Sequence, residues 1–463
     1  KNNIFKIMKT FFKHIFLFFL FNIYSQQHST HIPWKLEGAK ERIEKYRKGK
    51  VNLKFNISNE LIDKQANLKI RLTSHDFKFG VSFTQLRRFW GEDYGEIYLN
   101  KVKEVFNYAT IGMYWQLTDE RIKNNKMVKY YDEVIDWADK NDFRLKGHPL
   151  MWHEAMPDWV RNFKNLDKLD ILIKDHMKRL IETYPQINDW DVYNEPIGPF
   201  KPHIPPSAIT EWIKMKGGIY PAMVEIYQFV DSVNPNKNYS NNHYHAKDPE
   251  FLKINNFFVE KNLNFSSIGM QAHMQTNDNV MSESQLWNQI KEYEGLGKKI
   301  QFTEITVTSS ERFKNWKEHQ AFLKERDEVM SKGGVMNLAS LPEYENFQAD
   351  YLKDFYTLAF SHPSVSSITF WNLTDKNAWR GHAGGLLFDD LKPKKAFNEL
   401  KTLIKKTWTT KLVESNLNLK KGVDFNGFYG KYYGEITIEN IIYPFEFYHS
   451  PEQKNKATVI NIK

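Results

Sequence analysis

Two segments near the start of the chain alternate apolar and polar residues with a period of two. They are residues 51–57 (VNLKFNI) and 68–72 (LKIRL), and turn-forming residues separate them. The same alternation, rich in aromatic and β-branched residues, returns at residues 427–448. This pattern predicts half-buried antiparallel strands. Because the strand-rich segments lie far apart in the sequence, we expect them to pair into one small accessory β module.

Between these segments, stretches with helical spacing of apolar residues alternate with short apolar runs. The helical spacing is clearest at residues 173–184 and 223–233, and the second stretch stops at an Asn-Pro pair. Short strand candidates recur eight times between such helices: Phe77–Phe83, Asn107–Ile111, Arg144–Leu150, Asp189–Tyr193, Asn238–Asn242, Ser267–Gln271, Lys299–Glu304 and Ser367–Trp371.

Eight such repeats predict an α/β protein built on a closed (β/α)8 TIM barrel. In that fold the active site lies at the carboxyl ends of the strands. A doubly wound open sheet is the alternative. It would need a glycine-rich phosphate loop after an early strand, and the sequence contains no G-x-G-x-x-G or Walker-type segment.

The composition narrows the chemistry that the barrel can support. The 463 residues include no Cys, which excludes thiol nucleophiles, disulfides and thiolate metal sites. The net charge is +9, but four unopposed lysines stand within the first 13 residues and the remaining charge is spread along the chain. We therefore expect no nucleic-acid partner. Aromatic residues make up 15% of the chain, which suits stacking on sugar rings.

The first 25 residues have the pattern of a secretory signal peptide. A basic stretch ending at Lys13 and His14 precedes the apolar run 15–21, and polar residues follow. The run is shorter than the roughly 20 residues of a membrane-spanning helix, although an anchor is the alternative. We expect cleavage near Ser25, a secreted, periplasmic or cell-surface location, and no membrane contact after cleavage.

Polar residues stand at the predicted strand ends, where a barrel places its active site. Glu195 and Glu304 each close an apolar or aromatic run, WDVYNE and IQFTE. Either one alone could be neutralised by a Lys or Arg. Two glutamates that lie together at the barrel mouth, where the dielectric constant is low, indicate catalysis by a paired acid and base. Further polar or aromatic residues at strand ends are His148, Asn194, Gln271, His273 and Trp371.

Two other kinds of site find less support in the sequence. A metal site could draw on the histidines near two strand ends, but no carboxylate stands at ligand spacing from them. The segment HEAMP at 153–157 begins like a zinc-binding helix, yet Pro157 replaces the second His. The chain has no G-x-S-x-G segment of a serine hydrolase. We expect neither a metal nor a cofactor. The histidines considered as ligands are His148, His153, His243 and His245.

Five segments in order resemble the strand motifs of glycoside hydrolase family 10, the retaining endo-β-1,4-xylanases. They are GHPLMWHEAMPDWV (147–160), WDVYNEP (190–196), GMQAH (269–273), TEITV (303–307) and FWNLTDKNAW (370–379). The resemblance covers residues 77–404 and implies a secreted, endo-acting enzyme that cleaves internal β-1,4-xylosidic bonds of xylan by retaining double displacement. Its partner would be the polysaccharide alone, with the protein as a monomer.

The resemblance also implies roles for single residues. Glu195 matches the general acid/base and Glu304 the nucleophile, while His273 would hydrogen-bond the nucleophile. The implied substrate-binding residues are His148, Trp152, Asn194, Tyr244, Gln271, His273, Trp371 and Trp379. The implied organisation is a signal peptide (1–25), an N-terminal linker and β extension (26–74), the barrel (75–407) and a C-terminal β extension (408–463).

Three features depart from the family pattern. The stretch 110–115 lacks the Asn and Lys that grip the sugars in most members, and Tyr114 stands where the Lys is expected. Thr306 stands where the pattern has an Asp. The stretch of about residues 309–345 after the seventh strand is long and charged, and could reshape the cleft. Two alternatives therefore remain: a related retaining β-glycanase acting on another or a decorated polysaccharide, and a non-catalytic glycan-binding barrel.

Overall fold

The computed structural model describes residues 29–201, 204–453 and 456–462. The predicted signal peptide, residues 1–25, lies outside these ranges. Within them, no helix combines the length and the apolar character needed to cross a membrane.

Eight parallel strands form a closed barrel, in which each strand pairs with the next along the chain and the last pairs with the first. All eight predicted strands are confirmed, and the doubly wound open sheet is wrong. The strands are β3 (Lys78–Ser82), β4 (Tyr108–Gly112), β5 (Arg144–His148), β6 (Asp189–Asn194), β7 (Asn238–His243), β8 (Ser267–Met274), β9 (Lys299–Val307) and β10 (Val365–Phe370).

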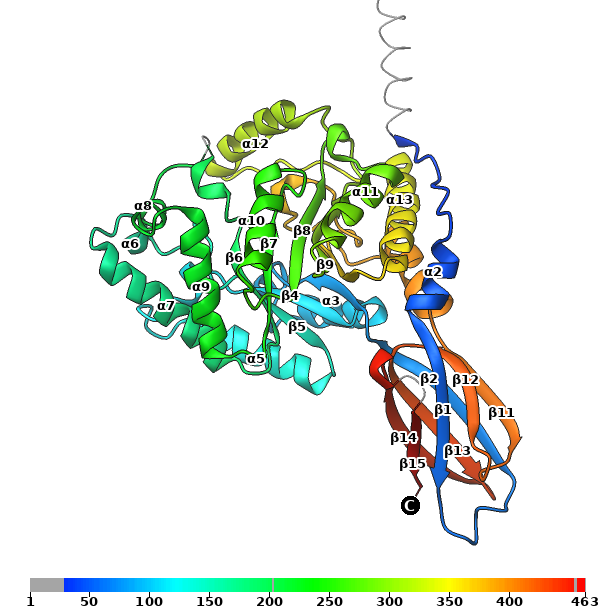
Figure 1. Ribbon diagram of the computed structural model, residues 1–463. Coiled ribbons are helices and arrows are strands. Elements are labelled where there is room, and N and C mark those ends of the chain that lie inside the picture. The colour runs from blue at the N-terminus through cyan, green and yellow to red at the C-terminus, as the bar shows by residue number, and fades with distance from the viewer. Residues whose placement is uncertain (1–28, 202–203, 454–455, 463) are drawn as a thin grey trace, which may run out of the picture.

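Helices surround the barrel and bury one apolar face against it (Figure 1). In the helix over 166–183, the predicted face packs inward through Ile173, Met177 and Leu180. Asn165 begins that helix by accepting a hydrogen bond from the Lys168 N–H. The ring consists of α3 (Asp93–Val105), α5 (Lys126–Lys140), α7 (Leu166–Thr183), α9 (Ile219–Val233), α10 (Pro249–Glu260), α11 (Glu283–Glu294), α13 (Pro342–Ser361) and α14 (Lys395–Thr402).

Further helical segments precede the barrel or lie in its connections. The α-helical ones are α2 (Ala39–Tyr46), α4 (Trp115–Thr118), α6 (Asp158–Arg161), α8 (Ala208–Met215) and α12 (Trp316–Ser331), of which α12 is the longest. The 3₁₀ segments are η1 (Leu86–Arg88), η2 (Gly198–Phe200), η3 (Asn277–Asn279), η4 (Trp379–Gly381) and η6 (Pro451–Gln453), and η5 (Leu403–Thr407) is a π-helix.

Strands that precede and follow the barrel in the sequence form one accessory β module, as predicted. The module consists of two sheets. The sheet orders are β12-β1-β15 and β11-β2-β13-β14. The first two strands do not pair with each other, but each has antiparallel partners from the C-terminal segment, as predicted. In addition, β1 runs parallel to β15, a strand that was not predicted. The strands are β1 (Lys48–Asn56), β2 (Ala66–His75), β11 (Lys411–Leu417), β12 (Val423–Phe428), β13 (Gly430–Ile438), β14 (Ile441–His449) and β15 (Ala457–Asn461).

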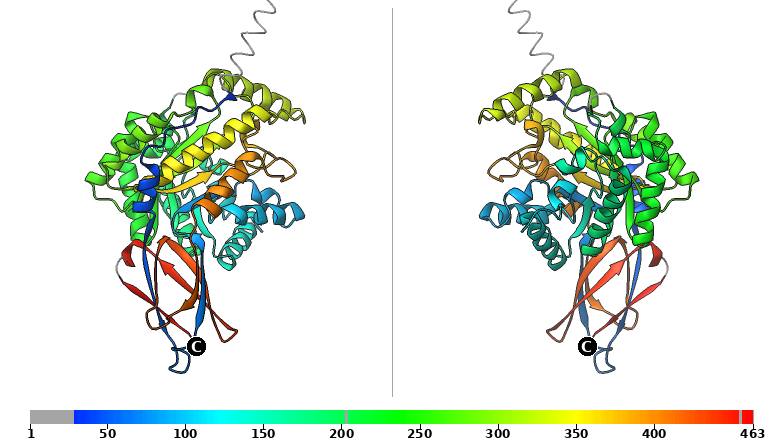
Figure 2. Two further views of the ribbon diagram at one scale, coloured as in Figure 1. Left: turned by 90° about the vertical axis from the view of Figure 1, so that its right-hand side faces the viewer. Right: turned by 90° about the vertical axis from the view of Figure 1, so that its left-hand side faces the viewer.

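The β module lies at the end of the barrel where the strands begin. Only two residues separate β2 from β3. Figures 1 and 2 show the module at one end of the molecule and α12 at the other. The stretch after β9 that was predicted as a long charged loop thus contributes a helix to the mouth end. The mouth formed by the carboxyl ends of the strands therefore faces away from the module (Figure 1).

Candidate active site

Glu195 follows directly after β6, where the chain turns away from the barrel. Its backbone has φ 59°, a left-handed conformation uncommon outside glycine, and its N–H donates to the Asn242 carbonyl at 2.8 Å. The carboxyl group accepts from Trp152 Nε1 at 3.2 Å and from Gln271 Nε2 at 2.9 Å. Burial, reinforced by the charge of Glu304, raises the pKa of Glu195 to about 7 although Gln271 opposes the shift.

Glu304 lies within β9 and has polar neighbours on both carboxyl oxygens. Asn242 Nδ2 donates to Oε1 at 3.0 Å, and His273 Nε2 lies 3.3 Å from Oε2. His148 Nε2 lies 4.0 Å from Oε1. Burial alone would raise the pKa of Glu304, but the hydrogen bond from His273 and the attraction of His148 outweigh it and lower the pKa below its ordinary value.

The two carboxyl groups are linked through shared neighbours. Gln271 lies opposite Glu304 in the register of β8 and β9, and its amide donates to Glu195. Asn242 contacts Glu195 through its backbone and Glu304 through its side chain. The structure therefore brings together one carboxyl group that favours the protonated form and one that favours the ionised form, which is the combination that acid and nucleophile require.

Asn242 is a site residue that the sequence analysis missed. Its Nδ2 donates to both Glu304 and Asn194 (2.8 Å), and its Oδ1 accepts from Thr303 at 2.7 Å. A Cβ at Gly269 would lie 2.6 Å from that Oδ1, so glycine leaves room for the amide. The available signal was β7 itself, whose sequence NYSNNH is polar yet buried after its first residue.

His148, at the end of β5, is held in place by another buried carboxylate. Its Nδ1 lies 2.8 Å from Asp191 Oδ2, and Lys146 Nζ lies 2.6 Å from the other oxygen of the same group. The attraction of Lys146 and the hydrogen bond from His148 lower the pKa of Asp191 to about 2 against the effect of burial. Asp191 thus fixes the imidazole so that Nε2 faces Glu304.

Aromatic rings surround the two carboxyl groups. Trp371 follows β10 and meets the His148 ring edge to face at 5.8 Å, and the Trp379 centroid lies 4.5 Å from that of His273. Tyr244 follows β7, and burial together with the charge of Glu195 raises its pKa to about 12. The predicted residues thus lie at strand ends or, for Trp152 and Trp379, in the segments that follow β5 and β10.

Thr306 and Tyr114, the two departures from the family pattern, both contact this site. His273 Nδ1 lies 2.9 Å from Thr306 Oγ1, and the Thr306 hydroxyl donates to the Trp371 carbonyl at 2.6 Å. The Tyr114 ring lies 5.8 Å from His148 and 5.7 Å from the Trp152 ring. A neutral hydroxyl and a buried phenol thus occupy positions where charged groups were expected.

Two other histidines near the mouth are buried without hydrogen bonds to the described residues. His153 and His243 have no hydrogen bond at either ring nitrogen among the described residues, and burial lowers the pKa of each to about 3. Across the described part of the chain, no group of three or more His, Cys, Asp or Glu side chains is placed to hold a metal ion.

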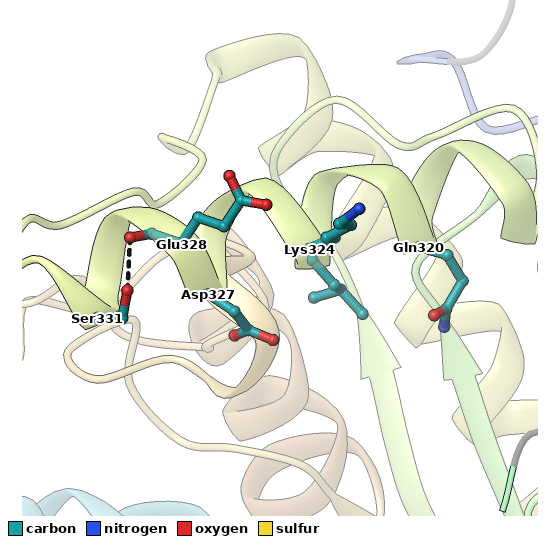
Figure 3. A pocket seen from close by; sticks show the side chains of 6 residues that line it. Gln320, Lys324, Asp327, Glu328 and Ser331 are labelled. Carbon is teal, nitrogen blue, oxygen red and sulfur yellow. Dashed lines mark hydrogen bonds between the residues drawn. The ribbon is translucent and has the colours of Figure 1, made fainter.

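A shallow hollow along α12 is separate from the mouth. Figure 3 shows side chains of that single helix along it, and Ser331 donates to the Glu328 carbonyl. Nearly all of them are exposed, as expected of a solvated helix face, and we assign them no function. The lining residues are Gln320, Leu323, Lys324, Asp327, Glu328 and Ser331.

Known proteins are similar to this chain in sequence and in fold. Endo-1,4-beta-xylanase B of Thermotoga neapolitana is 23% identical over 355 residues, which cover 73% of this chain and 92% of that protein. Endo-1,4-beta-xylanase A of Caldicellulosiruptor saccharolyticus is 25% identical over 327 residues, covering 68% and 87%. The structure of xylanase 10B from Thermotoga petrophila RKU-1 in complex with xylobiose has a TM-score of 0.55 at 21% identity, covering 71% and 94%.

The similarity to solved structures establishes the barrel fold. The family to which the chain belongs is shown by a separate match to a protein-family model. The sequence matches the model described as Glycosyl hydrolase family 10 over residues 46–403, which span all eight barrel strands. This range exceeds half of the chain. The protein therefore belongs to glycosyl hydrolase family 10.

Proposed function

We propose that this protein is a secreted endo-1,4-β-xylanase that hydrolyses internal bonds of xylan with retention of configuration. The observation that carries the proposal is the pair of unlike carboxyl groups in one mouth. Glu195 has a pKa raised to about 7, whereas Glu304 has a lowered pKa. A retaining glycosidase needs one protonated and one ionised carboxyl group on a single sugar.

The chemistry follows from these two states. Glu195 gives its proton to the glycosidic oxygen while the Glu304 carboxylate attacks the anomeric carbon. The bond between that carbon and the leaving oxygen breaks, and a glycosyl ester forms on Glu304. Glu195, now ionised, removes a proton from water, which attacks the same carbon and releases Glu304. Two inversions leave the product with the configuration of the substrate.

The surrounding residues would position the sugar for this reaction. The Asn194 Oδ1 is engaged by Asn242, whereas its amide N–H groups have no acceptor among the described residues. Trp152 and Gln271 act on Glu195 as well as on substrate, since both donate to its carboxyl group. We assign sugar binding to His148, Trp152, Asn194, Tyr244, Gln271, His273, Trp371 and Trp379.

The stereochemistry of the first product tests the mechanism. Proton NMR of a xylo-oligosaccharide digest should show the β anomer before mutarotation. Activity should be unaffected by a chelator, since no step uses a metal. An α first product would contradict a covalent intermediate on Glu304. The same enzyme should release oligosaccharides from soluble xylan, and a complete lack of release from every xylan would exclude the proposed substrate.

The Tyr114 position favours one second candidate, a retaining β-glycanase with another preferred backbone. The ring of Tyr114 packs against His148 and Trp152, where the family pattern places a cation. Comparing kcat/KM on purified xylan, mannan and mixed-linkage glucan separates the two candidates. A non-catalytic glycan-binding barrel would turn over none of them while still binding one.

A further inference from the structure

Arg380 lies beside the mouth between two tryptophan side chains. Its guanidinium carbon is 4.1 Å from the ring centroid of Trp379 and 5.3 Å from that of Trp316. Trp379 belongs to η4 after β10, whereas Trp316 begins α12, in the long insertion after β9. Both indoles are partly solvent-exposed, at 37% and 45%. The insertion thus supplies one side of a cationic stack at the edge of the active site.

This guanidinium has no anionic partner. Among the residues that the structure describes, Arg380 forms no hydrogen bond or ion pair, and its guanidinium stacks on two rings. Burial lowers the pKa of Arg380, while the charges of Glu195, Glu154 and Glu304 oppose that shift. A guanidinium offers five donors in a planar fork. A partly desolvated cation with unused donors is suited to an anion from outside the protein.

The stack is held rigidly. His319 of α12 and His382 after η4 lie with their Nε2 atoms 2.9 Å apart, and the Leu338 N–H donates to the Gly381 carbonyl at 2.8 Å. Arg380 itself has φ 59° and ψ 17°, a left-handed conformation that fixes the direction of its backbone. These contacts fix α12 against η4. Binding of a ligand to the stack should therefore cost little side-chain conformational entropy.

We propose that the Trp316–Arg380–Trp379 stack binds the carboxylate of a uronic acid substituent on the polysaccharide backbone. The inference rests on the proposed function and narrows its substrate class to acidic, glucuronic acid-bearing xylan. Guanidinium pairs with a carboxylate through two parallel hydrogen bonds, and the flanking indoles suit the faces of sugar rings. An unsubstituted xylan backbone is neutral and offers no carboxylate to the guanidinium donors of Arg380.

Arg380 is not needed to keep the nucleophile ionised. The Glu304 oxygens already have Asn242 and His273 as neighbours, at 3.0 and 3.3 Å. The two roles predict different kinetics. Substitution of a residue that binds the substituent should change KM on acidic substrate only. Substitution of a residue that stabilises the ionised form of Glu304 should change turnover and the acidic limb of the pH profile on every substrate.

The test uses glucuronoxylan and the same polymer after chemical reduction of its carboxyl groups. The full-length enzyme should show a kcat/KM about 10-fold higher on the acidic polymer, mainly through KM. Arg380→Gln should remove this preference, so that its kcat/KM is equal on the two polymers. Arg380→Lys should keep part of it. Arg121→Gln, which removes an exposed arginine stacked on a single tryptophan, is the matched control and should keep all of it.

A binding measurement separates this inference from the proposed reaction. Calorimetry on Glu304→Ala should show tighter binding of an acidic xylo-oligosaccharide than of the neutral one of equal length, and Arg380→Gln in that background should abolish the difference. Equal kcat/KM of the unaltered enzyme on both polymers would overturn the inference, and so would an equal loss on both polymers in Arg380→Gln. Either outcome would leave the proposed xylanase function standing. No turnover of either polymer would instead overturn the proposed function, and binding alone would then decide the role of Arg380.

Discussion

Glu195 and Glu304 lie in the same mouth, yet their pKa values move in opposite directions. The difference arises from their neighbours, because Glu195 has two neutral donors whereas Glu304 has two imidazoles and an amide nearby. Removing either group should therefore have a different kinetic effect.

Glu304→Ala should abolish turnover on all substrates, because no other group can form the glycosyl ester. Glu195→Ala should lose turnover mainly on substrates with poor leaving groups, since an activated aryl leaving group needs no acid. Added azide should rescue Glu195→Ala and give the β-glycosyl azide, as judged by NMR. An α-azide from Glu195→Ala would mean that the two roles are reversed.

The raised pKa of Glu195 sets the basic limb of kcat/KM, because the acid must be protonated. With a pKa of about 7 the rate should fall as pH rises through 7. The Gln271 amide stabilises the ionised form, so Gln271→Leu should raise the pKa further and move the basic limb up by as much as about one unit. Gln289→Leu, which alters a buried glutamine on α11 that donates only to a methionine sulfur, is the control. A basic limb that stays in place in Gln271→Leu would contradict this assignment.

Thr306 determines how strongly His273 supports the nucleophile. Burial lowers the pKa of His273, and the Thr306 hydroxyl carries no charge to oppose that shift. Thr306→Asp should raise the pKa of His273 and, through the imidazolium, lower the pKa of Glu304. The acidic limb of kcat/KM should then move down by up to about one pH unit. Thr306→Val, which cannot hydrogen-bond to His273, should not move the acidic limb to lower pH. An unmoved limb in the Asp variant would rule out the relay.

Strand-end residues could be predicted from the sequence, but their partners could not. Glu195 and Glu304 were recognisable because each ends an apolar run. Asn242 and Asp191 lie inside strands and act through contacts with residues about 40 to 60 positions away, such as Glu304 and His148. Sequence spacing holds no information on such contacts until the barrel order is known. Arg380 was missed for the same reason, since α12 reaches it across an insertion.

At the scale of elements, α12 is the part of the barrel that the sequence described least well. It was expected only as charged loop, because just two of its residues, His319 and Phe322, are buried. A helix without an apolar stripe gives no periodic signal. What holds it in place is the buried pair His319 and His382, which no local pattern reveals.

This histidine pair should make the docking of α12 sensitive to acid. Burial lowers the pKa of His319 to about 4 and that of His382 to about 3, aided by Arg380 and Arg326. Since both pKa values lie below that of a free imidazole, stability is lost as pH falls below about 6.5, by about 2 kcal/mol at pH 5 for each group. Glutamine keeps an N–H donor and does not titrate.

Thermal unfolding at pH 7 and pH 5 measures the effect. His319→Gln should show a smaller drop in Tm between the two pH values than the unaltered protein. His245→Gln, at an exposed position after β7, should show the full drop. An equal drop in all three proteins would mean that the pair does not couple α12 to pH.

At the scale of the whole molecule, the sequence predicted the barrel and the β module but not the strand order within the module. Alternation identifies a strand and its buried face, yet it does not identify the partner. The buried faces of Val51, Leu53, Leu68 and Ile70 pack together with Tyr432 in one core, so neither terminal segment can bury its apolar side alone.

A chain ending at residue 409 should therefore be poorly soluble, because β1 and β2 would expose their apolar faces. A chain ending at residue 456, which lacks only β15, retains both partners of β2 and should stay soluble with a lowered Tm. Sedimentation and thermal unfolding of the two shortened chains test this. Unchanged solubility of the shorter chain would show that the N-terminal strands are stable without their C-terminal partners.

The pairing of β1 with β15 also sets a time interval during synthesis. Roughly 400 residues separate the two strands, so at about 5 to 20 residues per second β1 leaves the ribosome some 20 to 80 seconds before its partner exists. Until β12 emerges both edges of β1 are unpaired, and the edge that pairs with β15 stays open to association with other nascent chains for the whole interval. The side chains that β1 does not bury are mainly Lys50, Asn52, Lys54 and Asn56. Two lysines of like charge, spaced along one face, disfavour stacking with a second copy until the last strand arrives.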